Sequence, residues 1–205
     1  GRVIDTHFVD DGHGNQIEVV KGAQGITAGV NYNANFYGGK GNDYFEVNHN
    51  IGQLSLFGEA GDDTFFLKAH LQSGVSGVQD ISGGEISAGA GDENNNVGEE
   101  EQNALISYVK NNRVSIYGGS GFDTLVLSGT RLGDSFYIFT DENDKQYLYG
   151  AGLKVEGVSG VERLALITGA GDDEVNLYGL SENISLLLSL GSGDDILNLG
   201  GEQKS

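Results

Sequence analysis

The 205-residue sequence contains neither cysteine nor proline. Without cysteine, the fold has no disulfides and no thiolate metal ligands, although this absence does not identify a cellular compartment. Without proline, the many glycines cannot belong to a low-complexity linker rich in both residues. Some other interaction must therefore stabilise the chain.

Basic residues are also scarce, because eleven Lys and Arg stand against 30 Asp and Glu, for a formal net charge of -19. No basic face can be assembled from so few cations, which argues against nucleic acid as a partner. The same charge argues against direct docking on anionic lipid. It favours cations, basic partners or simple solubility.

Long apolar runs are missing as well. The most apolar run, NISLLLSL, is far shorter than the roughly 18 residues of a membrane span. We find no N-terminal signal with a basic start and an apolar core. No initiator methionine precedes Gly1, so we expect a fragment or a processed product, with any targeting signal outside it.

Glycine is abundant: the chain has 35, or about one residue in six, against a usual share of roughly 7%. There is no G-x-y period, which excludes collagen. Tyr, Phe and clusters of Leu, Ile and Val recur throughout, which argues against a disordered tail.

An internal repeat uses many of these glycines. Six segments contain Gly-x-Gly-x-Asp or a close relative, and they start 20, 30, 30, 50 and 22 residues apart. They are GGKGNDYFE from Gly38, GEAGDDTFF from Gly58, AGAGDENNN from Ala88, GGSGFDTLV from Gly118, TGAGDDEVN from Thr168 and LGSGDDILN from Leu190. Short alternating runs such as RVSIY and TLVL flank them and are typical of half-buried strands.

The repeating unit is therefore strand, tight glycine loop, strand, and a unit of about twenty residues cannot bury a face alone. Stacking predicts an all-β, right-handed parallel β-solenoid (β-helix or β-roll) with the loops along one edge. We expect residues 1–36 to form an N-terminal cap or degenerate coil and residues 37–205 the repeats. Residues 92–103 are predicted to be an acidic insertion, and 140–150 a hairpin or surface loop. Residues 99–111 tolerate a helix, although ALISYV could equally be a strand.

The loop composition suits calcium, which takes six to eight oxygen ligands. Glycines allow positive φ, so that a short loop can turn several carbonyls inward. Stacked loops lie about 4.8 Å apart, and an ion could be held between two of them. Without it, rows of aspartates such as Asp63, Asp173 and Asp195 would repel each other. The following apolar residue should anchor each loop in the core: Phe45, Phe65, Leu125, Val175 and Leu197.

These segments resemble the RTX (repeats-in-toxin) family, whose nonapeptide is G-G-x-G-x-D-x-U-x with U a large apolar residue. The copies at Gly38 and Gly118 match at every defined position, whereas Glu59 replaces a glycine. Glu93 and Asn95 depart further, which predicts a weak or empty site. The copies are dispersed rather than tandem, as in the G-x-G-x-D repeats of very large bacterial surface proteins and adhesins.

The resemblance implies calcium-coupled folding and export to a calcium-rich medium. It places the metal ligands in the repeated loops. The predicted metal-binding residues are Gly39, Gly41, Asp43, Gly61, Asp62, Asp63, Gly91, Glu93, Gly119, Gly121, Asp123, Gly169, Gly171, Asp172, Asp173, Gly191, Gly193, Asp194 and Asp195. Of the last two, Asp195 is the expected side-chain ligand, and Asp194 stands at a variable position where its carbonyl could contribute.

We therefore predict a non-catalytic, calcium-binding structural module of a large secreted or cell-surface bacterial protein, related to adhesins or toxins. Its expected partners are calcium ions, adjacent modules of the same polypeptide, and a carbohydrate or surface ligand. Residues 92–103 or 141–149 could make that contact, and Tyr37, Tyr117, Tyr147, Tyr149 and Tyr178 could face a sugar.

The alternative is a β-helical polysaccharide lyase or epimerase, or its calcium module. Paired carboxylates are abundant, and a glycosidase needs only two. However, the pairs lie inside repeated loops, which favours a structural role. The four histidines show no zinc-binding spacing, and neither a G-x-S-x-G elbow nor a P-loop occurs.

Overall fold

A computed structural model describes residues 6–10, 16–20, 29–73 and 106–201. The chain divides into two compact units, each built from segments that are distant in the sequence. Unit one comprises Gly1–Ile26 and Leu71–Tyr108, and unit two comprises Thr27–His70 and Val109–Ser205. The predicted acidic insertion at 92–103 and the repeat copy with Gly91 and Glu93 lie outside the described residues.

Unit one contains two short antiparallel pairs in its described part. Strand β1 (Thr6–Asp10) pairs with β2 (Gln16–Val20), and β7 (Leu71–Ser73) pairs with β8 (Ile106–Tyr108). Part of the stretch that tolerated a helix, Ile106–Tyr108, is therefore a strand.

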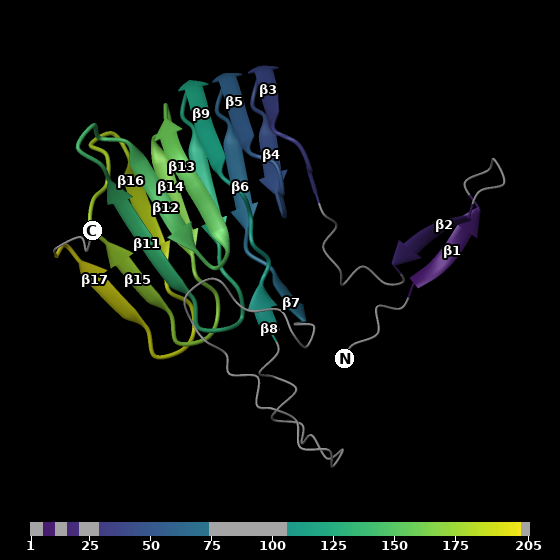
Figure 1. The fold of residues 1–205 in the computed structure, drawn as a ribbon. Helices are drawn as coiled ribbons and strands as arrows, with labels where there is room; N and C mark the ends of the chain where they lie inside the picture. The colour runs from purple at the N-terminus through teal and green to yellow at the C-terminus, as the bar shows by residue number, and fades with distance from the viewer. Residues whose placement is uncertain (1–5, 11–15, 21–28, 74–105, 202–205) are drawn as a thin grey trace, which may run out of the picture. The chain divides into compact units, whose positions relative to one another are not determined.

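Unit two contains two larger sheets (Figure 1). The five-stranded sheet is entirely parallel, in the order β16 (Ser185–Ser189), β14 (Arg163–Ile167), β10 (Thr124–Ser128), β6 (Thr64–Lys68) and β4 (Tyr44–Val47). The order of the eight-stranded sheet is β17 (Ile196–Leu199), β15 (Glu174–Leu177), β11 (Ser135–Thr140), β12 (Gln146–Gly150), β13 (Leu153–Ser159), β9 (Val114–Ser120), β5 (Leu54–Ala60) and β3 (Ala34–Lys40).

Successive strands mostly alternate between the two sheets, so each glycine loop connects one sheet to the other. Strand β5 leads through a loop to β6, and β9 leads through an equivalent loop to β10. The strands are paired in register, with Phe57 opposite Tyr117 and Glu59 opposite Gly119. This register stacks the loops directly on one another.

Every second residue of the central strands is buried, which gives each sheet one apolar inner face. Leu54 and Leu56 of β5 and Leu125 and Leu127 of β10 are at most 4% exposed. Of the predicted anchors, Phe65, Leu125 and Val175 are buried and Phe45 is half-buried. Leu197 is 41% exposed because it lies on the edge strand β17.

The prediction of a right-handed parallel β-solenoid is wrong, although the all-β composition holds for the described residues. Strand β12 runs antiparallel to both β11 and β13, so the eight-stranded sheet is mixed. The reason is local: the amides of Asn143 and Lys145 donate to Oδ1 of Asp141, which closes a tight turn after β11. Residues 140–150 therefore form a hairpin that adds its own strand to the sheet.

The prediction that the loops follow one edge is also wrong. The loops β3–β4, β5–β6 and β9–β10 leave the carboxyl ends of eight-stranded-sheet strands, and we call them the first loop row. The loops β10–β11, β14–β15 and β16–β17 enter the amino ends of β11, β15 and β17, and we call them the second loop row. Because β11, β15 and β17 run in the same direction as β3, β5 and β9, the two rows lie at opposite ends of the strands.

Candidate cation-binding loops

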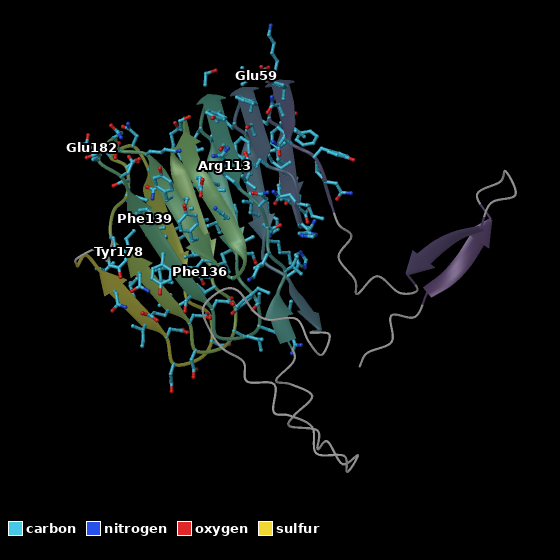
Figure 2. All side chains as sticks on the ribbon, viewed as in Figure 1. Glu59, Arg113, Phe136, Phe139, Tyr178 and Glu182 are labelled. Atoms are coloured by element: carbon cyan, nitrogen blue, oxygen red, sulfur yellow. The ribbon has the colours of Figure 1, made fainter. Side chains whose placement is uncertain are left out.

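Each glycine loop turns through two residues with left-handed backbone, at its second and fourth positions. In the β3–β4 loop these are Gly39 and Gly41, with φ of 97° and 107°. The equivalent glycines elsewhere are Gly61, Gly119, Gly121, Gly169, Gly171, Gly191 and Gly193. The exception is Glu59, a non-glycine residue at φ 77°. Figure 2 shows its side chain at the end of unit two where β3, β5 and β9 finish.

In the first loop row, the first position of a loop requires glycine for a different reason, which is the space around its Cβ position and not its φ. The sequence did not reveal this reason. An ideal Cβ on Gly58 would lie 2.1 Å from Oδ2 of Asp63 and 2.5 Å from the carbonyl oxygen of Gly118. In the same way, a Cβ on Gly118 would lie 2.5 Å from Oδ2 of Asp123. In the first loop row, the first glycine therefore makes room for the carboxylate of its own loop, whereas Thr168 and Leu190 hold this position in two loops of the second row.

One carboxylate oxygen of Asp63, Asp123, Asp173 and Asp195 joins neighbouring loops. The amide of Asp43 donates to Oδ1 of Asp63 at 2.7 Å, and the amide of Asp63 donates to Oδ1 of Asp123 at 2.7 Å. In the second row, the amide of Asp173 donates to Oδ1 of Asp195 at 3.0 Å. The predicted aspartates are thus brought together as two ladders and not as one.

Two residues of these ladders, Glu162 and Asp134, were not predicted from the sequence. Glu162, in the β13–β14 loop, accepts the amide of Asp123 at 2.7 Å. In the second row, the amide of Asp134 donates to Oδ1 of Asp173 at 2.8 Å. The interval from Gly129 to Asp134 equals that from Gly58 to Asp63, so spacing alone could have found Asp134. No comparable motif marks Glu162.

The fifth-position side chains form a second ladder that runs the other way. The amide of Asp62 donates to Oδ1 of Asn42, and the amide of Phe122 donates to Oδ1 of Asp62. In the second row, the amide of Asp194 donates to Oδ1 of Asp172 at 2.9 Å. Asp62 and Asp172 are exposed at the surface, and their carboxylates act as backbone acceptors.

The other oxygen of four sixth-position aspartates is buried and has no hydrogen-bond partner. These atoms are Oδ2 of Asp43, Asp63, Asp123 and Asp173. The last three residues are at most 1% exposed. A buried carboxylate oxygen without a donor carries a large desolvation cost unless a positive species neutralises it.

The pKa of Asp123 also indicates that its buried carboxylate lacks a positive partner. Burial raises the pKa of Asp123, and the negative charges of Asp63, Glu162 and Asp62 raise it further. The hydrogen bond from the Asp63 amide offsets only part of this rise. The site therefore disfavours an ionised carboxylate with no counter-charge.

The ladders do not gather several carboxylates around one point. Among the described residues, no group of three or more His, Asp or Glu side chains could hold a metal ion. Each loop contributes a single inward aspartate, so the remaining ligands of a cation would be backbone carbonyls. Residues Gly191, Gly193 and Asp194 of the last loop are exposed, and Asp195 is half-buried.

Four of the tyrosines considered for sugar binding, Tyr37, Tyr117, Tyr147 and Tyr149, lie on strands of the eight-stranded sheet, and Tyr178 follows β15. Phe57 stacks between Tyr37 and Tyr117, with centroid distances of 4.7 and 4.6 Å and nearly parallel planes. Both faces of Phe57 are therefore covered by rings. Tyr147 packs against Phe139 at 5.0 Å and donates to Asp141, whereas Tyr37 remains 61% exposed.

No family model, curated protein or solved structure matches this chain. The likeness to RTX repeats therefore depends on the loop residues. Within the part of the chain that the structure describes, no helix is long and apolar enough to cross a membrane.

Proposed function

We propose that the chain is a non-catalytic structural module that binds calcium along its two loop rows. The observation that carries the proposal is the set of four buried Oδ2 atoms without donors, at Asp43, Asp63, Asp123 and Asp173. Three of these aspartates are nearly fully buried. At each of the four, the fold places no hydrogen-bond donor against that oxygen, so a bound cation would supply the missing positive partner.

The donor set fits calcium better than other common metals. Calcium prefers carboxylate and carbonyl oxygens in a flexible arrangement, whereas zinc prefers imidazole and thiolate ligands. Oδ2 of each of the four aspartates would be one ligand, and carbonyls of the same and neighbouring loops would supply others. Bound calcium would neutralise the buried carboxylates. In the first loop row the first-position glycine keeps this space open, since at Gly58 a Cβ would lie 2.1 Å from Oδ2 of Asp63.

Calcium would then stabilise the folded state by mass action, because the unfolded chain has no preformed loops. The net charge of -19 strengthens this coupling, since the ion-free module carries strong self-repulsion. Low-affinity calcium modules of this kind work at the millimolar concentrations found outside cells. The proposal therefore includes a secreted or cell-surface parent protein, with neighbouring modules of the same polypeptide as partners.

Asparagine substitution tests the proposal with little change in shape. In Asp63→Asn, the amide oxygen can still accept from the Asp43 amide, and the side chain no longer carries a buried charge. We expect this variant to bind less calcium than the unaltered chain. In EDTA it should have a higher Tm than the unaltered chain, because the buried charge is gone.

The measurements are isothermal titration calorimetry with calcium chloride and thermal unfolding by circular dichroism, in EDTA and in millimolar calcium. The matched control is Asp144→Asn, which removes the same charge at an exposed turn residue outside both loop rows. It should leave calcium binding unchanged. Absence of calcium binding and of any calcium-dependent rise in Tm in the unaltered chain would refute the proposal.

A further inference from the structure

The β10–β11 loop, residues 129–134, shares the register of the glycine loops although its sequence lacks Gly-x-Gly-x-Asp. Asp134 is 1% exposed, and its amide donates to Oδ1 of Asp173 at 2.8 Å. An ideal Cβ on Gly129 would lie 2.5 Å from Oδ2 of Asp134 and 2.1 Å from the carbonyl oxygen of Thr168. The carboxylate of Asp134 therefore occupies the same kind of space as that of Asp63.

Its hydrogen bonding differs from that of the other loops. The amide of Thr130 donates to Oδ2 of Asp134 at 2.6 Å, and the Thr130 hydroxyl donates to Oδ1 at 3.0 Å. The amide of Leu132 in turn donates to the Thr130 hydroxyl at 3.2 Å. Both oxygens of this buried carboxylate thus have donors from within their own loop.

Among the described loops, the backbone of residues 129–134 explains why these donors are present. Thr130 stands at the second position, which elsewhere holds a residue with positive φ such as Gly39 or Gly119. Neither Thr130 nor Leu132 has positive φ. This backbone directs the Thr130 amide at the carboxylate and sets the partial positive charge of its hydrogen against Oδ2 of Asp134.

We propose that Thr130 closes this loop in place of a cation. Calcium would occupy the loops of Asp43, Asp63, Asp123 and Asp173 but not the loop of Asp134. This inference depends on the proposed calcium function and specifies which loops take part in it. The β10–β11 loop is then a calcium-independent connection at the start of the second row, next to the hairpin.

Two substitutions of matched chemistry distinguish the loops. Asp173→Asn replaces a carboxylate whose Oδ2 lacks a donor, so it should raise Tm in EDTA and lower the number of calcium ions bound. In Asp134→Asn only one side-chain oxygen remains as an acceptor for the Thr130 amide and hydroxyl. The new NH₂ group then faces the other of these two donors. It should lower Tm by a similar amount in EDTA and in saturating calcium, without changing the number of ions bound.

Calcium counting by equilibrium dialysis on the full chain, with Tm measured alongside, gives both readouts. If the unaltered chain binds no calcium, both the proposed function and this inference fail. If it binds calcium and Asp134→Asn lowers the number bound as much as Asp173→Asn does, only this inference is overturned.

Thr130→Val provides a second test that keeps the carboxylate, in case Asp134→Asn does not fold. Loss of the hydroxyl, which donates to Asp134 and accepts from the Leu132 amide, should lower Tm by about 2–4 °C in EDTA and by the same amount in saturating calcium. A loss of Tm in EDTA that disappears in calcium would show that an ion holds this loop, and would overturn the inference.

Discussion

The amide of Asp63 donates to Oδ1 of Asp123 at 2.7 Å, although the two residues are 60 positions apart in the sequence. The amide of Asp43 makes the same contact with Asp63 across only 20 positions. The loops therefore stack in the same way whatever length of chain separates them, because strand register and not sequence interval sets their contacts. Predictions about these loops can be made from their shared geometry.

Replacing Glu59 by glycine should stabilise the module. A non-glycine residue in the left-handed region destabilises the folded state by about 1–2 kcal/mol, which glycine would remove. Glycine also gives the unfolded chain more conformational freedom, which offsets part of this gain in stability. We expect Glu59→Gly to raise the free energy of unfolding by about 0.5–1 kcal/mol, measured by urea denaturation. Glu46→Gly, the same change within strand β4, should be destabilising. Equal effects of the two variants would contradict the explanation from backbone strain.

Two glycines of the first loop row should respond differently to alanine. At Gly58 a Cβ would lie 2.1 Å from Oδ2 of Asp63, so Gly58→Ala must displace the carboxylate and should cost about 3 kcal/mol. At Gly41 nothing lies within 4 Å of the Cβ position, and only φ of 107° is unfavourable. Gly41→Ala should therefore cost about 1–2 kcal/mol.

Chemical denaturation in saturating calcium compares the two variants, and calorimetry measures their calcium affinity. Gly58→Ala should also weaken calcium binding, since it moves a proposed ligand. A result in which Gly41→Ala is the more damaging of the pair would mean that the first glycine is not there to accommodate the carboxylate.

Low pH should reduce the stability that Glu156 contributes through its contacts with Lys154, Tyr149 and Arg113. Burial alone would raise the pKa of Glu156, but hydrogen bonds from Lys154 and Tyr149 and the charges of Lys154 and Arg113 lower it below its usual 4.5. The ionised form is thus favoured in the folded state. Its contribution to stability is fully present above the unfolded pKa of 4.5 and is lost as pH falls through the lower folded value.

We therefore expect Glu156→Gln to have a lower Tm than the unaltered chain at pH 7, with a difference that shrinks below about pH 4. Tm measured from pH 3 to 7 tests this, with Glu142→Gln at an exposed turn as the control. A difference that stays constant down to pH 3 would show that charge is not the cause.

The hairpin should depend on Gln146, a fully buried side chain. Its amide NH₂ donates to the carbonyls of Phe139, Tyr147 and Gly179, and its oxygen accepts from the amide of Ser181. Gln146→Leu leaves several buried backbone groups without partners and should cost about 2–3 kcal/mol. Gln146→Glu keeps the acceptor but loses the donors and buries a charge, so it should cost more. The free energies of unfolding of the two variants, measured by urea titration, test whether Gln146→Glu is the more destabilising.

Local sequence signals predicted much of what is local in the structure. Alternating runs such as RVSIY and TLVL became β9 and β10, and the glycines at the second and fourth loop positions adopt positive φ. Both follow from side-chain periodicity and backbone sterics, which involve only neighbouring residues. The turn held by Asp141 is equally local, and the predicted hairpin or loop at 140–150 is a hairpin.

The sequence by itself therefore determined the strand–loop–strand units, because backbone conformation and alternation are set within a few residues. Only the tertiary structure decided that the loops form two rows, that Glu162 and Asp134 continue the ladders, and that four Oδ2 atoms lack partners while Thr130 completes a fifth loop. These features depend on strand direction and on contacts between residues 20 to 60 positions apart. A short stretch of sequence cannot predict which carboxylate oxygen of a loop aspartate will accept a hydrogen bond once the strands are paired.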